Sequence, residues 1–329
     1  MLLKILKTKQ PLLIIIIPLI AVLLWLKALV GTTDFNINTA IQMPLYQLIS
    51  PIVNFNIYTS KFFGIVFMLL QAFLLAMLNM KFFFIKQRTY LHTFTYILII
   101  SSSVLLQYSS PALIANFFVI FAFDWLFSSY KKYNTNKELF NVGLLLGVGT
   151  LFYFNIILLL PFFIIAYLIL HTGRLREIFV IIAGFLAPVL VFVQIAFLND
   201  SLHHFINKLE MAFSQMKYHY SFFTKNNIFY LYLIILVLLS FFKFFAIIGT
   251  KKIASRKIFS IFLLYIIYLI SILIIVPLFD FQILVLLSVP VSYFITDYYI
   301  NIKDNILAEL SFILLIISLV ITQFSIFNF

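Results

Sequence analysis

A run of 32 residues without a charged or histidine side chain, Leu139 to Leu170, most strongly constrains the fold of this chain. One straight helix of that length would be about 48 Å long at about 1.5 Å per residue, whereas the hydrocarbon core of a bilayer is about 30 Å thick. A hairpin of two helices, with its turn near residues 153–155, fits better. It also places the basic residues that flank the run in the cytoplasm, as the positive-inside rule requires. Those residues are Lys131, Lys132 and Lys137 before the run and Arg174 and Arg176 after it.

The composition extends this interpretation to the whole chain. Of the 329 residues, 64% are hydrophobic and only 10% are charged, and apolar runs of about 18 or more residues, typical of transmembrane helices, recur from end to end. Strands of a membrane barrel would instead alternate apolar and polar residues. The sequence therefore predicts an all-α, polytopic transmembrane helix bundle. Its net charge of +12 lies in short loops, where it orients the protein, so we expect no nucleic-acid partner.

We predict about 11 spans, a cytoplasmic N-terminus and one integral membrane domain over residues 1–329. The expected location is the inner (plasma) membrane of a bacterium, with outer loops at 31–59 and 199–227. This topology places most of the 22 Lys and Arg residues inside. Besides the hairpin, the predicted spans are 12–30, 60–80, 91–108, 111–129, 178–198, 228–248, 258–276, 281–299 and 306–326.

The first outer loop contains a candidate catalytic acid, Asp34, just beyond the first predicted span. A carboxylate there could act as a general base or hold a divalent cation, which is the one cofactor that we consider. The simpler interpretation is a solvated turn residue. The chain contains no cysteine, which excludes disulfides and thiolate chemistry.

The second outer loop contains an amphipathic stripe over residues 202–216, with apolar side chains at helical spacing. We predict a helix in the outer interface, with its polar face toward water or lipid headgroups. His204 and Lys208 lie one turn apart on that face, a spacing that suits a phosphate, and Lys217 follows. The alternative is an interfacial helix with a solvated face. We expect no metal site, because adjacent histidines point apart on a helix.

Two acids within apolar runs need a separate interpretation. Asp124 lies inside the predicted span 111–129, where a carboxylate is costly and often functional, but a structural pairing near the basic end of that span is favoured. Asp297 is interpreted as an interface residue near the inner end of its span. Gly143, Gly147 and Gly149 indicate close helix packing in the hairpin.

Together these residues resemble the type C glycosyltransferase superfamily, membrane enzymes that move a sugar from a polyprenyl-phosphate carrier on the outer leaflet. The resemblance spans most of the chain through short motifs: Asp34, the box Pro44-Leu45-Tyr46, the Gly-rich hairpin 143–161 and the late Pro-containing stretch 280–290. It implies inverting sugar transfer with Asp34 as the catalytic residue. The substrate-binding residues that it implies are Tyr46, Lys61, His204, Lys208, Lys217 and Asp280.

The chain departs from that family at two places. Members often carry a second acid and a His before the Pro-Leu-Tyr box, where this chain has Gln42 and Met43, and often Arg-Tyr in the late span, where it has Phe281 and Gln282. The chain also resembles small uncharacterised integral membrane families of bacteria that share this helix layout, and it is either a divergent member of the superfamily or one that keeps the scaffold without the chemistry. The functional alternatives are therefore a non-catalytic membrane subunit or scaffold that binds lipid or a partner protein, and a transporter. A transporter should show paired broken helices or charges near mid-bilayer, and only Asp124 approaches that. Membrane lipids and a polyprenyl-linked sugar are the expected partners.

Overall fold

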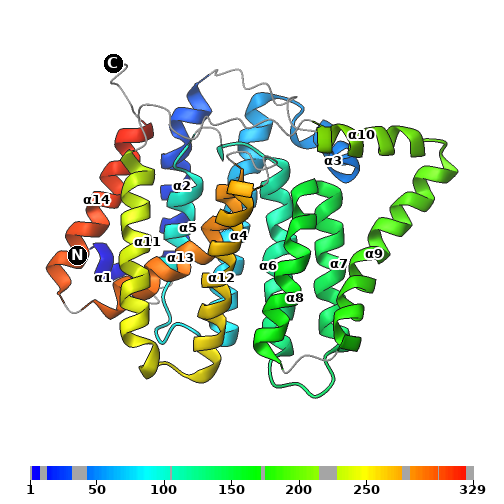
Figure 1. The fold of residues 1–329 in the computed structure, drawn as a ribbon. Helices are drawn as coiled ribbons and strands as arrows, with labels where there is room; N and C mark the ends of the chain where they lie inside the picture. The colour runs from blue at the N-terminus through cyan, green and yellow to red at the C-terminus, as the bar shows by residue number, and fades with distance from the viewer. Residues whose placement is uncertain are drawn as a thin grey trace.

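The computed structural model describes residues 2–7, 13–31, 43–103, 106–171, 175–214, 228–275, 282–302 and 304–323. All regular elements within these ranges are helices (Figure 1). In chain order they are α1 (Leu2–Lys7), α2 (Leu13–Val30), α3 (Pro44–Val53), α4 (Ile57–Phe82), α5 (Leu91–Ile100), α6 (Pro111–Ser129), α7 (Asn136–Phe152), η3 (Phe154–Leu158), α8 (Leu159–Leu170), α9 (Leu175–Leu198), α10 (Leu202–Ser214), α11 (Ile228–Ile247), η4 (Ile248–Thr250), α12 (Ile253–Ile275), α13 (Ile283–Asn301) and α14 (Asn305–Gln323).

Eight helices of the described chain are long and apolar enough to cross a membrane, namely α2, α4, α6, α9, α11 with η4, α12, α13 and α14. The protein is therefore a multi-pass integral membrane protein with a helical bundle fold. The predicted count of about 11 spans is not established by these helices. The remaining predicted spans correspond to shorter segments: α5 with 10 residues, α7 with 17, and the stretch Phe154–Leu170 formed by η3 and α8.

The predicted break in the long apolar run is present. Helix α7 ends at Phe152, Tyr153 is extended (φ −140°, ψ 110°), and η3 and α8 lead back. Asn155 Nδ2 donates a hydrogen bond to Tyr153 Oη at 2.8 Å, so the polar residue of the turn is used within it. This turn lies at the end of the bundle where α3 and α10 lie, opposite the α6–α7 and α11–α12 connections (Figure 1).

Reporter fusions will test the orientation of this hairpin. A fusion after Asn155 should report outside, and fusions after Lys132 and Arg176 should both report inside, because the basic clusters stay in the cytoplasm. Paired alkaline phosphatase and green fluorescent protein fusions measure this directly. An inside signal after Asn155 would mean that the run crosses only once, and the orientation of every later helix would then invert.

Within the predicted span 91–108, the α-helix α5 ends at Ile100, and all ten of its residues are buried. Beyond α5 the backbone turns at Ser101, whose carbonyl accepts a hydrogen bond from Gln107 Nε2 at 2.9 Å and whose Oγ accepts one from Trp25 Nε1 at 2.9 Å. Non-helical backbone at membrane depth is tolerated only where protein surrounds it. Helix α6 then begins at Pro111, with Ser110 Oγ accepting from Leu113 N.

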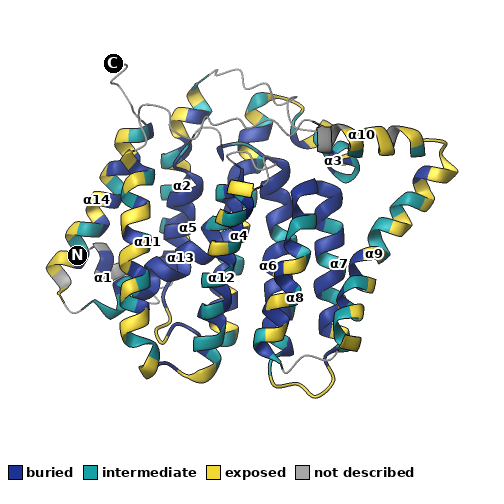
Figure 2. Ribbon diagram, in the orientation of Figure 1, coloured by how far each residue is buried: buried dark blue, intermediate teal, exposed yellow. Residues whose placement is uncertain are grey.

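Glycines bring α7 and α9 into close contact. A Cβ on Gly143 would lie 2.0 Å from the Ile181 carbonyl oxygen, and one on Gly184 would lie 2.2 Å from the Phe140 carbonyl oxygen. Gly147 likewise faces the backbone of α9. The predicted packing role is therefore confirmed for two glycines of the hairpin, and Gly149 faces side chains of η3 and α6 instead. Figure 2 shows α7 mostly buried and the upper part of α9 mostly exposed.

Asp124 and Asp297 each form an ion pair. Asp124 pairs with Lys81 of α4 at 2.7 Å, so the predicted structural pairing is present, with a partner from another helix. Asp297 pairs with Lys251 at 2.5 Å, and both side chains are buried. Asp297 lies near the end of α13, as predicted, and the structure adds that it is buried between helices and paired there.

Candidate functional site

Two short helices lie at the same end of the bundle, the end that the predicted topology places outside: α10 runs across this end, and α3 lies beside α10 (Figure 1). Pro44 occupies the first position of α3, where its fixed φ and missing N–H suit a helix start. The predicted interfacial helix over 202–216 is present as α10, and residues 215 and 216 lie outside the described residues. Both outer loops therefore place an amphipathic helix at one surface.

These two helices are joined directly. Lys208 Nζ donates a hydrogen bond to Gln47 Oε1 at 2.6 Å, across 161 residues of sequence. Beside it, Met43 and Phe154 are buried against each other, with Leu209 packed on them. Partial burial lowers the pKa of the Lys208 ammonium. The outer loops thus form one surface above the α7–α8 turn.

Tyr46 attaches α3 to the bundle. Its ring is buried, its hydroxyl donates to the Ser109 carbonyl at 2.9 Å, and it accepts from Asn54 Nδ2 at 2.7 Å. Burial raises the pKa of Tyr46, and the bond from Asn54 acts in the opposite direction. Asn54 Oδ1 also accepts from Ser109 Oγ at 2.7 Å. The geometry gives Tyr46 a positioning role for the Pro-Leu-Tyr box, and its contact with substrate stays a prediction.

Lys61, in the first turns of α4, is buried against the C-terminal end of α2 and is only 2% exposed. Its Nζ donates to the carbonyls of Ala28 and, at 2.7 Å, Gly31. The last carbonyls of a helix have no partner within it and carry the negative end of its dipole, so a cation there is well placed. Lys61 therefore holds the end of α2 from which the Asp34 loop departs, and its binding of substrate stays a prediction.

The remaining predicted site residues cannot be placed at the level of side chains. Asp34, Lys217 and Asp280 lie outside the described residues, and of His204 only the backbone in α10 is described. Within the described part of the chain, no group of three or more His, Cys, Asp or Glu side chains could hold a metal ion. The structure therefore brings together Lys208 and the Tyr46 box, with Lys61 at the start of the Asp34 loop.

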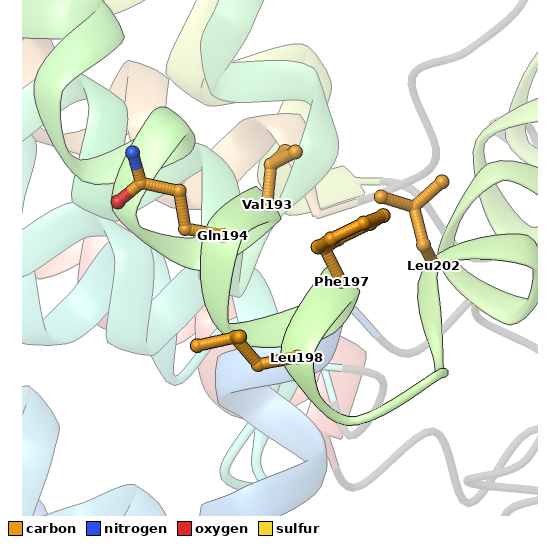
Figure 3. Close-up of a pocket in the computed structure, with 5 residues that line it drawn as sticks. All are labelled: Val193, Gln194, Phe197, Leu198 and Leu202. Carbon is orange, nitrogen blue, oxygen red and sulfur yellow. The ribbon is translucent and has the colours of Figure 1, made fainter.

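The elbow between α9 and α10 contains an apolar cavity of about 400 Å³ (Figure 3). Asp200 turns the chain here with φ 53°, a left-handed conformation. Four apolar side chains and one amide surround the cavity: Val193, Gln194, Phe197, Leu198 and Leu202. The elbow carries α10 away from the direction of α9 and toward α3, where Lys208 bonds to Gln47.

Sequence reasoning missed Gln47, Asn54 and Ser109. Gln47 follows the Pro-Leu-Tyr box directly, and this adjacency was its only sequence signal. Asn54 and Ser109 are ordinary loop residues in sequence, and their bonds to Tyr46 and to each other depend on how α3 lies against the start of α6.

A family model described as "Family of unknown function (DUF6427)" matches residues 34–328. The chain belongs to this family. No curated protein and no solved structure matches the chain. The DUF6427 match begins at Asp34, within the first predicted outer loop, and includes the whole second one, and it assigns no activity to them.

Proposed function

We propose that this protein is a membrane glycosyltransferase of type C architecture, which moves a sugar from a polyprenyl-phosphate carrier at the outer leaflet. The observation that supports this most is the joining of the two outer loops through Lys208 and Gln47. Lipid-linked sugar phosphates present their headgroups at the membrane interface, where an amphipathic helix such as α10 would turn its polar face, with Lys208, toward them.

The segment that contains the candidate acid begins and ends at residues that the structure describes. Asp34 follows Gly31 by three residues in the sequence. Gly31 is held by Lys61, and Met43, beyond the loop, is held against Phe154. Both ends of the segment that contains Asp34 are therefore anchored at the outer face.

The proposed chemistry uses two groups of this chain. Asp34 takes the proton from an acceptor hydroxyl, whose oxygen attacks the anomeric carbon while the bond from that carbon to the carrier phosphate breaks. Lys208 holds the phosphate, because an ammonium has three N–H donors and Gln47 occupies one of them. The other members of the proposed substrate-binding set are Tyr46, Lys61, His204, Lys217 and Asp280. A divalent cation at Asp34 is the alternative to a general base.

A non-catalytic subunit or scaffold is the second candidate. It is favoured by the internal partners of Tyr46 and Lys61, whose polar atoms bond to Ser109, Asn54, Ala28 and Gly31. These contacts stabilise the outer face whether or not a substrate binds there.

Replacement of the acid separates the two candidates. Asp34→Asn keeps size and polarity but removes the charge, and general-base catalysis contributes about 10² to 10⁴ in rate. We expect glycan transfer to fall by at least about 100-fold, with expression and melting temperature near wild type. The measurement is mass spectrometry of lipid-linked sugars and glycans from cells with wild-type, variant or no gene.

Asp200→Asn is the matched control, because it removes an outer-face acid at a left-handed position that Asn also tolerates. It should leave transfer unchanged. Lys208→Ala should weaken donor binding, and excess lipid-linked sugar should partly restore transfer. Wild-type glycan output from folded Asp34→Asn protein would contradict the enzymatic proposal and leave the scaffold.

A further inference from the structure

An ion pair on the outside of the bundle, between α4 and α6, is exposed to the membrane. Lys81 Nζ lies 2.8 Å from Asp124 Oδ1 and 2.7 Å from Oδ2, and the two side chains are 51% and 28% exposed. Lys81 is in the last turn of α4, and Asp124 lies five residues before the end of α6, roughly 7 Å along the axis. The pair is therefore at the depth where hydrocarbon meets the inner headgroups.

An apolar groove of about 220 Å³ begins at this pair. It extends toward the middle of the membrane, because its other lining residues precede the pair along both helices. These residues are Leu74, Met77, Leu78, Ile120 and Phe121. Met77 and Phe121 are exposed at the surface, so the groove is open to lipid from the side.

Lys81 can donate further hydrogen bonds, and Asp124 can accept further ones. A lysine ammonium has three donors, and a carboxylate has about four lone-pair sites, while the contact between Lys81 and Asp124 uses only part of each. Polar groups at this depth are costly unless they find partners. A ligand that fits must therefore offer an acceptor to Lys81, an N–H donor to Asp124 and an apolar chain to the groove.

We propose that this groove binds a phospholipid with a primary ammonium in its headgroup, of the phosphatidylethanolamine type. The lipid phosphate accepts from Lys81, the ammonium donates to Asp124, and one acyl chain lies between α4 and α6. A choline headgroup has no N–H to donate, and an anionic glycerol headgroup brings no positive charge to Asp124. This site is at the inner leaflet and is independent of the proposed sugar transfer.

Native mass spectrometry of the purified, delipidated full chain tests the proposal. With equal amounts of phosphatidylethanolamine, phosphatidylcholine and phosphatidylglycerol, wild-type protein should retain the ethanolamine lipid about tenfold over the choline lipid, because a hydrogen bond to a charged group has about that effect. Asp124→Asn should abolish this preference. Lys81→Gln should weaken all three lipids.

Lys132→Gln is the matched control. Lys132 is also 51% exposed and pairs with Glu138 at 2.6 Å at the same end of the bundle, outside the groove. It should keep the wild-type preference. Met77→Trp fills the groove without changing a charge and should weaken all three lipids, which tests the site even if a charge variant folds poorly. Equal retention of ethanolamine and choline lipids by wild type, or a copurified protein that covers α4 and α6 and excludes lipid, would overturn the proposal.

Discussion

Gly143→Val should prevent α7 and α9 from packing and should destabilise the protein by at least about 3 kcal/mol, the upper part of the usual range for overpacking. The reason is that the first side-chain atom already lies 2.0 Å from the Ile181 carbonyl oxygen and 2.7 Å from the Phe185 amide nitrogen. These are backbone atoms of a helix, so no rotamer change can relieve the clash. The measurement is thermal unfolding of detergent-solubilised protein. Gly184→Val should show a similar loss from the other side of the contact, since its Cβ meets the Phe140 carbonyl oxygen.

The same substitution at Gly249 is the control, because a Cβ there has nothing within 4 Å. Gly249→Val should change stability by no more than about 0.5 kcal/mol, as surface substitutions usually do. If Gly143→Val and Gly249→Val unfold at the same temperature, the close contact between α7 and α9 does not contribute to stability as the structure indicates.

Lys251→Met should destabilise the protein by about 3 to 5 kcal/mol, the usual cost of leaving one partner of a buried ion pair unpaired. Lys251 Nζ and Asp297 Oδ1 are 2.5 Å apart, and the side chains are 6% and 5% exposed. After the change, Asp297 Oδ1 keeps the bond from Asn301 Nδ2 at 3.1 Å, which cannot balance a full charge. Denaturant or thermal unfolding in detergent measures the loss.

The double variant Lys251→Met with Asp297→Leu should recover most of that stability, because no charge then remains buried. Lys81→Met is the control for a pair of the same chemistry that is exposed, and its cost in delipidated protein should be about 0 to 1 kcal/mol. A double variant less stable than Lys251→Met alone would contradict this account of the pair.

Local sequence was sufficient for the features that depend on one segment. Run length alone predicted the break near Tyr153, because a helix much longer than the hydrocarbon core would have to leave it. Periodicity predicted α10, because the apolar stripe exists only if residues three and four apart share a face. The glycines of the hairpin indicated close packing before any neighbour was known. In each case the pattern that supports the prediction lies within one continuous segment of the sequence.

The candidate site was predictable only in part. The helical spacing of 202–216 predicted that Lys208 lies on the polar face of a helix, but its bond to Gln47 crosses 161 residues and has no local signal. Lys61 lies near the start of α4, as the predicted span boundary implied, and only the packing of α2 shows that the carbonyls of Ala28 and Gly31 accept from its ammonium. The sequence predicted that these groups lie at a membrane surface. Their hydrogen-bond partners could not be predicted, because those partners come from other helices.

The sequence by itself determined that this chain is a helical membrane protein, since an apolar backbone in lipid must satisfy its own hydrogen bonds. The tertiary structure decided which charges are paired: Asp124 with Lys81, 43 residues away, and Asp297 with Lys251, 46 residues away. It also decided that α5 ends at Ile100, because buried partners from α2 and the following loop satisfy the turn at Ser101. Hydropathy and spacing act along one helix, whereas a buried charge or an irregular backbone is stable only where a different helix supplies its partner.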